Sequence, residues 1–297
     1  LKAIHETGND LVAALDVSDS VGILDRHFPQ ARFFTAPERF ERFLHQSRVG
    51  LERGQVDFVS ICSPNYLHDA HVRMALMAEA DAICEKPLVI SPWNLDVLRE
   101  IEEESGKRVY TILQLRLHPT LVALKERLGD SPRSGPAKVN LTYVTHRGPW
   151  YDISWKGSEA KSGGVAMNIG VHFFDLCMWL FGPVDTIAVH LAEPRRMAGV
   201  LGLERATVSW FLSIEKDDLP AAQREAGAMA YRSLSIDGEE IEFTHGFADL
   251  HTEVYRNVLA GKGPGIEDAR PSIELVHAIR HVDAVEPGDV AHPFLKG

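Results

Sequence analysis

Two short clusters of polar residues stand in apolar surroundings and have the residue types that acid–base chemistry needs. The first is Glu85-Lys86, which follows the apolar residues 82–84 and precedes Pro87. Ligands collect at the carboxyl ends of the strands in an open α/β sheet, so an acid and a lysine at such an end are candidates for a ligand site. A surface ion pair is the alternative interpretation of these two residues.

The second cluster lies within residues 162–175. Helical spacing places Asn168, His172 and Asp175 on one face at i, i+4 and i+7. Three interpretations compete for this polar stripe: a hydrogen-bonded core histidine, part of a metal site, or a general base with the neighbours that orient it. No third ligand stands at a fixed spacing that would suit a metal ion, so we expect no metal site.

The composition is that of an ordinary soluble protein. A chain of 297 residues with 45% apolar residues exceeds what one hydrophobic core usually organises, which predicts two domains. The net charge of −11 argues against general binding to nucleic acid or to an anionic membrane. The longest apolar stretch, residues 171–184, is too short to span a bilayer. The three cysteines lack CxxC spacing, which indicates a reducing compartment, and we expect a cytoplasmic protein.

The first third of the chain alternates short apolar runs with helical patterns, which is typical of βαβ units. We therefore expect an α/β fold with a Rossmann-type doubly wound parallel sheet over residues 1–115. Asp16 would end a strand there, where an acid accepts hydrogen bonds from the adenosine ribose of NAD and repels the extra phosphate of NADP. A helix or turn cap is the alternative for Asp16. Strands are expected at 10–16, 56–63, 82–85 and 108–116.

The glycine-rich turn that usually opens such a domain does not precede Asp16. Residues 1–7 have the spacing of the end of a helix, and the first residue is Leu1. We expect the sequence to lack a first strand and its glycine-rich turn, and to bind NAD weakly or not at all without that backbone cradle.

Residues 116–297 have a different pattern, with period-two alternation in longer segments. They predict an α+β domain with a large, mostly antiparallel open sheet, in which Asp237-Gly238 forms a hairpin turn. We expect this one-sided sheet to offer an apolar or mixed face, and a homodimer or homotetramer to form through it. The expected strands are 138–146, 184–192, 204–215 and 233–243, followed by helices at 249–260 and 268–282.

Three motifs together resemble the glucose-fructose oxidoreductase/inositol dehydrogenase/MocA family of nicotinamide dehydrogenases. They are ICSPNYLH at 61–68, CEKPL at 84–88 and GGVAMNIGVHFFD at 163–175. More narrowly, YDISWKG at 151–157 and EDARPSIELV at 267–276 resemble the bacterial UDP-N-acetylglucosaminuronate 3-dehydrogenases of surface-polysaccharide biosynthesis. The resemblance covers nearly the whole chain.

This resemblance implies a catalytic pair. Lys86 would hydrogen-bond the reacting sugar hydroxyl, and His172 would accept its proton as hydride leaves for NAD, a pairing that suits alcohol oxidation near neutral pH. Asp175 would fix the helix or the imidazole. Asn168 stands where the family commonly has Asp. Because Asn carries no charge, it would orient a substrate hydroxyl, and it would not repel an anionic uronic acid.

The resemblance also implies binding residues. Glu85 would lie along the nicotinamide ribose, while Arg116 and Lys156 would hold a substrate carboxylate or diphosphate. The other residues expected to line the cofactor are Ser63, Pro64, Asn65 and His68, and those expected beside the substrate are Tyr151, Trp155 and Asn168.

The activity implied is NAD-dependent oxidation of the C3 hydroxyl of UDP-N-acetylglucosaminuronic acid to the 3-keto sugar nucleotide. Similar enzymes sometimes reoxidise their NAD with 2-oxoglutarate. The alternatives are a dehydrogenase of a free sugar or inositol, a lyase that forms a Schiff base on Lys86, and a non-catalytic sugar-nucleotide binding protein.

Overall fold

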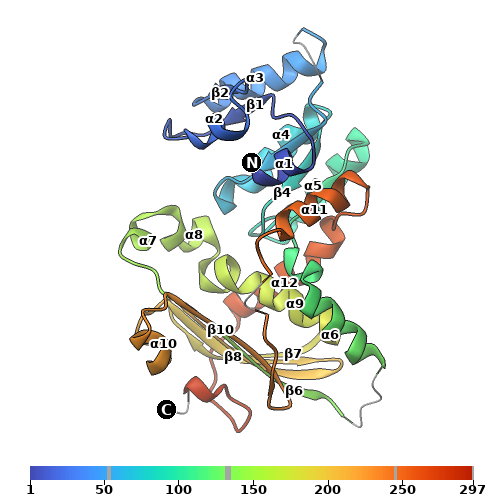
Figure 1. The fold of residues 1–297 in the computed structure, drawn as a ribbon. Coiled ribbons are helices and arrows are strands. Elements are labelled where there is room, and N and C mark those ends of the chain that lie inside the picture. Colours follow the sequence, from blue (N-terminus) through green and yellow to red (C-terminus); the bar gives the residue numbers. More distant parts are fainter. Residues whose placement is uncertain (52–54, 131–134, 244–245, 296–297) are drawn as a thin grey trace.

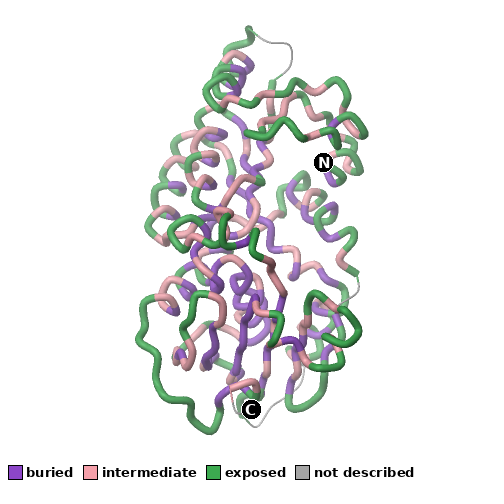
Figure 2. Tube along the Cα trace, turned by 90° about the vertical axis from the view of Figure 1, so that its left-hand side faces the viewer, coloured by how far each residue is buried: buried purple, intermediate pink, exposed green. Residues whose placement is uncertain are grey.

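Short parallel strands lie at one end of the molecule and a six-stranded sheet lies at the other, with helices between them (Figure 1). The computed structural model describes residues 1–51, 55–130, 135–243 and 246–295. Buried segments run through the interior of both ends, and exposed segments form the periphery (Figure 2).

The amino-terminal strands are parallel, as predicted, but in the described residues they form two sheets rather than one. β1 (Ala13–Leu15) pairs with β2 (Arg32–Phe34), and β4 (Asp81–Cys84) lies between β3 (Phe58–Ile61) and β5 (Val109–Thr111). The sequence pattern does not predict β2, because its three residues are largely exposed and show no alternation. The helices of this part are α1 (Lys2–Glu6), α2 (Ile23–His27), α3 (Pro37–Arg48), η1 (Asn65–Leu67), α4 (His68–Met77), α5 (Trp93–Ser105), η2 (Gln114–Leu117) and α6 (Pro119–Asp130).

The six-stranded sheet has the order β11-β10-β6-β9-β8-β7. Its neighbouring strands are antiparallel except for β6 and β9, which are parallel, so the expected mostly antiparallel sheet is confirmed. The hairpin turn at Asp237-Gly238 is also confirmed, with φ values of 51° and 88°. The strands are β6 (Ala137–Thr145), β7 (Val184–Ala192), β8 (Arg196–Leu203), β9 (Ala206–Ser213), β10 (Ala230–Ile236) and β11 (Glu239–Glu240).

The alternation pattern misses β8, which contains two glycines. At Gly199 an added Cβ would lie 2.2 Å from the backbone oxygen of Ala188 and 2.9 Å from the ring of Trp210. The close approach of β7 and of the Trp210 side chain therefore requires glycine at this position, although glycine weakens the signal of a strand in the sequence.

A long apolar helical segment lies between the sheets. It consists of α8 (Glu159–Ser162), a π-helical turn (Ala166–Gly170) and α9 (Val171–Phe181). By length and composition, Glu159–Phe181 could span a membrane, but 72% of its most apolar window is buried inside the protein, as in the core helix of a folded domain. Phe173 packs on Tyr143 of β6, and Phe174 packs edge-on against Trp210 of β9.

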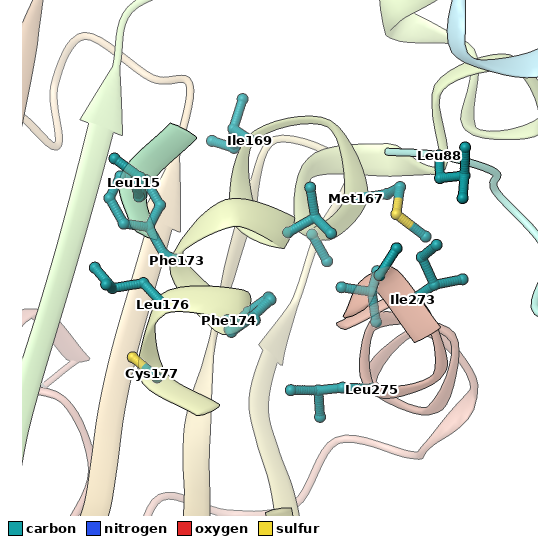
Figure 3. Close-up of a cluster of buried hydrophobic side chains, with 14 of the residues drawn as sticks. Leu88, Leu115, Met167, Ile169, Phe173, Phe174, Leu176, Cys177, Ile273 and Leu275 are labelled. Atoms are coloured by element: carbon teal, nitrogen blue, oxygen red, sulfur yellow. The ribbon is translucent and has the colours of Figure 1, made fainter. Parts of the chain in front are cut away.

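Figure 3 shows how this segment connects the two ends of the molecule. Leu115, near the end of the first third of the chain, lies beside Phe173, and Leu88 lies near Met167. Ile273 of α12 (Ile266–His281) packs on the same core. Burial of these apolar side chains fixes the helix that carries His172 against the strand ends that carry Lys86.

The carboxyl-terminal tail covers part of one face of the six-stranded sheet. The Ser209 hydroxyl donates to the backbone oxygen of Val290 at 2.6 Å, and Thr142 is 3.0 Å from Nε2 of His292. His292 also stacks on Phe211, whose side chain is fully buried. Period-two alternation places these strand residues on the face opposite α9.

One helix from the end of the chain returns to the amino-terminal strands. In α11 (Leu250–Leu259), Val254 and Val258 pack with Ile83 of β4 and Tyr110 of β5. α11 also contacts α1 and η2, and Figure 1 shows it away from the six-stranded sheet. The remaining short helices are α7 (Trp150–Ile153), η3 (Trp155–Gly157), α10 (Ala221–Glu225) and η5 (Pro293–Leu295).

Candidate functional site

Lys86 follows β4, the middle strand of its sheet, and its side chain reaches the second half of the chain. Its Nζ donates a hydrogen bond to the backbone oxygen of Asn168 at 3.0 Å. Burial lowers the pKa of Lys86 to about 8; the charge of Glu85 opposes this shift, and the charges of Lys156 and Arg147 add to it. The ammonium group is therefore mostly protonated at neutral pH and has further N–H groups to donate.

His172 is the second residue of α9. Burial lowers its pKa well below the usual value, and the positive charges of Lys86 and Arg232 lower it further. Nδ1 of the imidazole is buried and has no hydrogen-bond partner in the described part of the chain. A neutral imidazole can accept a proton at a ring nitrogen, as a general base does.

Asp175 contacts Arg116 rather than the imidazole. Its carboxylate, which is almost fully buried, accepts hydrogen bonds from Nε and Nη2 of Arg116 at 3.0 and 2.6 Å. Nη1 of Arg116 donates to Asp268 at 3.2 Å. Burial would lower the pKa of Arg116, but these carboxylates outweigh it and raise the pKa. Through Arg116, Asp175 links α9 to η2 and α12. This contact fits the first of its two expected roles, which were to fix the helix or to fix the imidazole.

The three residues of the predicted polar stripe lie in one continuous helical segment and have different partners. Asn168 lies in the π-helical turn, where hydrogen bonds span one more residue than in an α-helix. The Asn168 amide donates to the Tyr151 hydroxyl at 3.0 Å, whereas the Asp175 carboxylate accepts from Arg116.

The expected substrate loop lies next to these groups. Tyr151 is buried and meets Asn168, as described, and burial raises its pKa. The Nζ of Lys156 lies 5.3 Å from the ring centroid of Trp150 and 5.5 Å from that of Trp155, within range of cation–π attraction. The loop therefore brings a cation and aromatic rings toward Lys86.

The expected cofactor residues divide into two groups. In the first group, His68 and Asn65 are buried and contact backbone carbonyl groups. The ring nitrogens of His68 lie 2.6 and 2.8 Å from the carbonyl oxygens of Pro87 and Ser63. The side chain of Asn65 donates to the carbonyl oxygen of Ser162 at 2.8 Å. They tie the turn after β3 to the residues around Lys86 and to α8. Pro64 precedes η1 in that turn.

The second group is more exposed. Asp16 follows β1, and its Oδ1 accepts a hydrogen bond from the N–H of Ser18 at 2.8 Å. The Glu85 carboxylate lies 3.1 Å from Nε2 of His251. Burial opposes ionisation of Glu85, but the hydrogen bond and charge of His251 together with Lys86 have the larger combined effect and lower the pKa of Glu85. Asp16, Ser63 and Glu85 thus stand at the carboxyl ends of β1, β3 and β4, where this architecture binds dinucleotides.

Sequence reasoning missed three residues of the site: Arg147, Arg232 and His251. Arg147 follows β6 directly, and a cation at a strand end was the available signal. Arg232 lies over the aromatic rings of Tyr143, Phe173 and Phe247, and His251 is brought in by α11; neither has a local signal. No group of three or more His, Cys, Asp or Glu side chains with metal-site geometry occurs within the described residues.

Family models match both parts of the chain. The model described as oxidoreductase family, NAD-binding Rossmann fold, matches residues 2–113, and the model of the family's C-terminal alpha/beta domain matches residues 136–219. The WlbA (WbpB) dehydrogenase from Thermus thermophilus, solved in complex with NAD and UDP-GlcNAcA, is 50% identical with a TM-score of 0.93, and the match covers 99% of this chain and 94% of that chain. The chain belongs to the Gfo/Idh/MocA oxidoreductase family.

A second structure and two curated proteins are also similar to this chain. The T. thermophilus dehydrogenase was also solved with NAD and alpha-ketoglutarate, and that chain is 51% identical with a TM-score of 0.94, the match covering 99% of this chain and 94% of that one. Among curated proteins, the putative oxidoreductase YteT from Bacillus subtilis is 28% identical over 54% of this chain, and D-apiose dehydrogenase from Paraburkholderia graminis is 24% identical over 76%. The match spans only 39% of YteT and 60% of the apiose enzyme.

Proposed function

We propose that this protein is an NAD-dependent dehydrogenase that oxidises the C3 hydroxyl of UDP-N-acetylglucosaminuronic acid to the 3-keto sugar nucleotide. The observation that carries the proposal is the hydrogen bond from Lys86, at the carboxyl end of a parallel strand, to the backbone of Asn168, in the helical segment that also carries the neutral His172. The choice of substrate is supported by the T. thermophilus dehydrogenase solved with UDP-GlcNAcA.

Lys86 and His172 have different roles in removing the proton of the alcohol. Lys86 donates a hydrogen bond to the reacting hydroxyl, which stabilises the alkoxide character that develops as the carbon loses hydride. His172 takes the hydroxyl proton. NAD, when bound, supplies the chemistry of accepting the hydride. The negative charges of the substrate favour the protonated forms of Lys86 and His172. Substrate binding therefore raises the pKa of His172, which burial lowers.

The residues present fit NAD. Asp16 has a carboxylate at the end of β1. Among the residues that the structure describes, the N–H of Ser18 engages its Oδ1, and Oδ2 can accept from a ribose hydroxyl. Glu85 and Ser63 would contact the nicotinamide side. Pro64, Asn65 and His68 would shape the turn that holds the cofactor. The carboxylate of Asp16 would repel the 2′-phosphate of NADP.

The substrate would lie between Lys86 and the loop that carries Tyr151, Trp155 and Lys156. Trp155 offers an aromatic face to a base or sugar, and Asn168 presents its side chain beside Tyr151. Arg116, which two carboxylates already engage, would contribute to this site mainly by holding α9 in place.

Other aspects of the proposal concern the whole protein. We propose that residues 1–115 bind NAD while residues 116–297 bind substrate and mediate self-association as a homodimer or homotetramer. Exposed Val285 and Val290 of the tail that covers the sheet offer apolar surface for that contact. We further propose that 2-oxoglutarate reoxidises the bound cofactor, and that the enzyme acts in the cytoplasm in lipopolysaccharide or O-antigen biosynthesis.

The experiment that tests this function is incubation of the protein with NAD and candidate substrates, with and without 2-oxoglutarate. We expect UDP-N-acetylglucosaminuronate to give a 3-keto product by mass spectrometry and 2-hydroxyglutarate when 2-oxoglutarate is present. If inositol or a free sugar is oxidised and the UDP-uronate is not, the substrate assignment is wrong. Light scattering of the same preparation measures the oligomeric state.

A further inference from the structure

Two cations near Lys86 are not neutralised by any carboxylate of the described chain. They are Arg147 and Lys156. Arg116 differs from them, because its guanidinium donates to both Asp175 and Asp268. An arginine that the protein itself has paired is poorly placed to bind a ligand carboxylate, whereas an unpaired one retains its planar fork of donors.

The backbone of Arg147 is held on both sides. Its N–H donates to the carbonyl of Ile214, just beyond β9, at 3.1 Å, and its own carbonyl accepts from Nη2 of Arg195 at 3.2 Å. Arg195 also forms ion pairs with Asp152 of α7, at 2.6 Å, and with Glu215. The end of β6, the end of β9 and the substrate loop are thereby joined at Arg147, while its guanidinium makes no hydrogen bond within the described residues.

The positive charge of Arg147 affects the pKa values of Lys86 and Lys156. It contributes to lowering the pKa of Lys86 and of Lys156, for both of which burial is the largest cause. Arg147, Lys156 and Lys86 repel one another, and Glu85 offsets only part of the charge of Lys86, in a protein whose net charge is −11. An anionic ligand group would relieve this repulsion, and a neutral group would not.

We propose that Arg147 is the residue that selects uronic acids, by binding the 6-carboxylate of the sugar with Lys156 beside it. This inference rests on the proposed function, since it names the group of that substrate which the site recognises. Arg147 offers two parallel N–H donors to a carboxylate. A substrate with a hydroxymethyl group at the same position leaves the N–H donors and the charge of Arg147 without a partner. It therefore binds less tightly, and the site discriminates between the carboxylate and the hydroxymethyl sugar.

The test compares UDP-N-acetylglucosaminuronate with UDP-N-acetylglucosamine, which has a hydroxymethyl group in place of the carboxylate. Binding is measured by calorimetry with NAD present, for the wild type, Arg147→Gln and Arg147→Lys. We expect Arg147→Gln to weaken binding of the uronate about 10- to 100-fold, in line with the loss of a charge-assisted hydrogen bond. Binding of the neutral sugar nucleotide should change little, and Arg147→Lys should recover part of the loss. Arg42→Gln, on an exposed position of α3, is the matched control.

A second readout separates a charge effect from a structural one. Removing the charge of Arg147 raises the pKa of Lys86, so the alkaline limb of the kcat/KM profile for the uronate should move to higher pH in Arg147→Gln. Equal weakening for both sugar nucleotides, or an unmoved alkaline limb, overturns the inference. A wild type that prefers the uronate in calorimetry but reduces no NAD refutes the proposed reaction while leaving the role of Arg147 intact.

Discussion

Replacing Arg116 by Met should destabilise the protein strongly, because it leaves a buried carboxylate without its partner. The side chain of Asp175 is 3% exposed and that of Arg116 is 20% exposed, so solvent screens this pair little, whereas Asp268 at 49% can be hydrated when Arg116 is removed. Loss of one partner from such a buried pair costs about 3–5 kcal/mol. In melting temperature this corresponds to a decrease of roughly 6–20 °C for a chain of this size class.

The assay is thermal unfolding followed by calorimetry and circular dichroism, for Arg116→Met, Asp175→Asn and the double variant. The double variant should be more stable than Arg116→Met, because it no longer buries an unpaired charge. The defect of Arg116→Met should also shrink as the pH falls toward about 4, the ordinary pKa of a carboxyl, since Asp175 then carries a proton in both the folded and the unfolded state.

Arg256→Met is the control for this experiment, because the pair of Arg256 with Glu253 is about half exposed and such pairs contribute roughly 0–1 kcal/mol. The reasoning is refuted if Arg116→Met melts within a degree or two of the control, or if the double variant is less stable than Arg116→Met.

Three further predictions concern the reaction and the sheet. Lys86→Met and His172→Asn should each lower kcat by at least about 10²–10⁴-fold, with circular dichroism spectra unchanged; near-normal turnover removes that residue from the mechanism. The kcat/KM of the wild type should fall as the pH rises through about 8, because Lys86 then loses the proton that it donates; a profile flat to pH well above this value contradicts the role of its charge. Gly199→Val should destabilise by at least about 1–3 kcal/mol, as overpacking does, because its Cβ would overlap the carbonyl of Ala188; unchanged melting contradicts the tight contact.

The sequence predicted those helices and strands that are determined by residues close together in the chain. The helix α5 is followed by Gly106, which has a φ of 66°, the left-handed conformation that glycine adopts most readily, so a single residue marks the end of this helix. Lys86 follows a buried strand, as its apolar neighbours indicated. Short strands with exposed residues, such as β2, carry no such pattern and were missed.

The site depends on contacts between distant residues, and sequence spacing does not contain these. Arg116 was expected to be available to substrate, but its partners Asp175 and Asp268 lie 59 and 152 residues away in the chain. The π-helical turn before α9 likewise has no signal in the sequence pattern. The tail on the outer sheet face was invisible in the sequence, because its residues have no strand or helix periodicity.

The return of α11 to the amino-terminal strands limits how this protein can be dissected. A fragment that ends at residue 115 would expose Ile83, Tyr110 and Ile112, which α11 covers through Val254 and Val258. Such a fragment would present an apolar surface prone to aggregation. Chimeras that exchange the sugar-binding half between relatives must therefore keep α11 with the half that binds the dinucleotide, although it is encoded more than one hundred residues later.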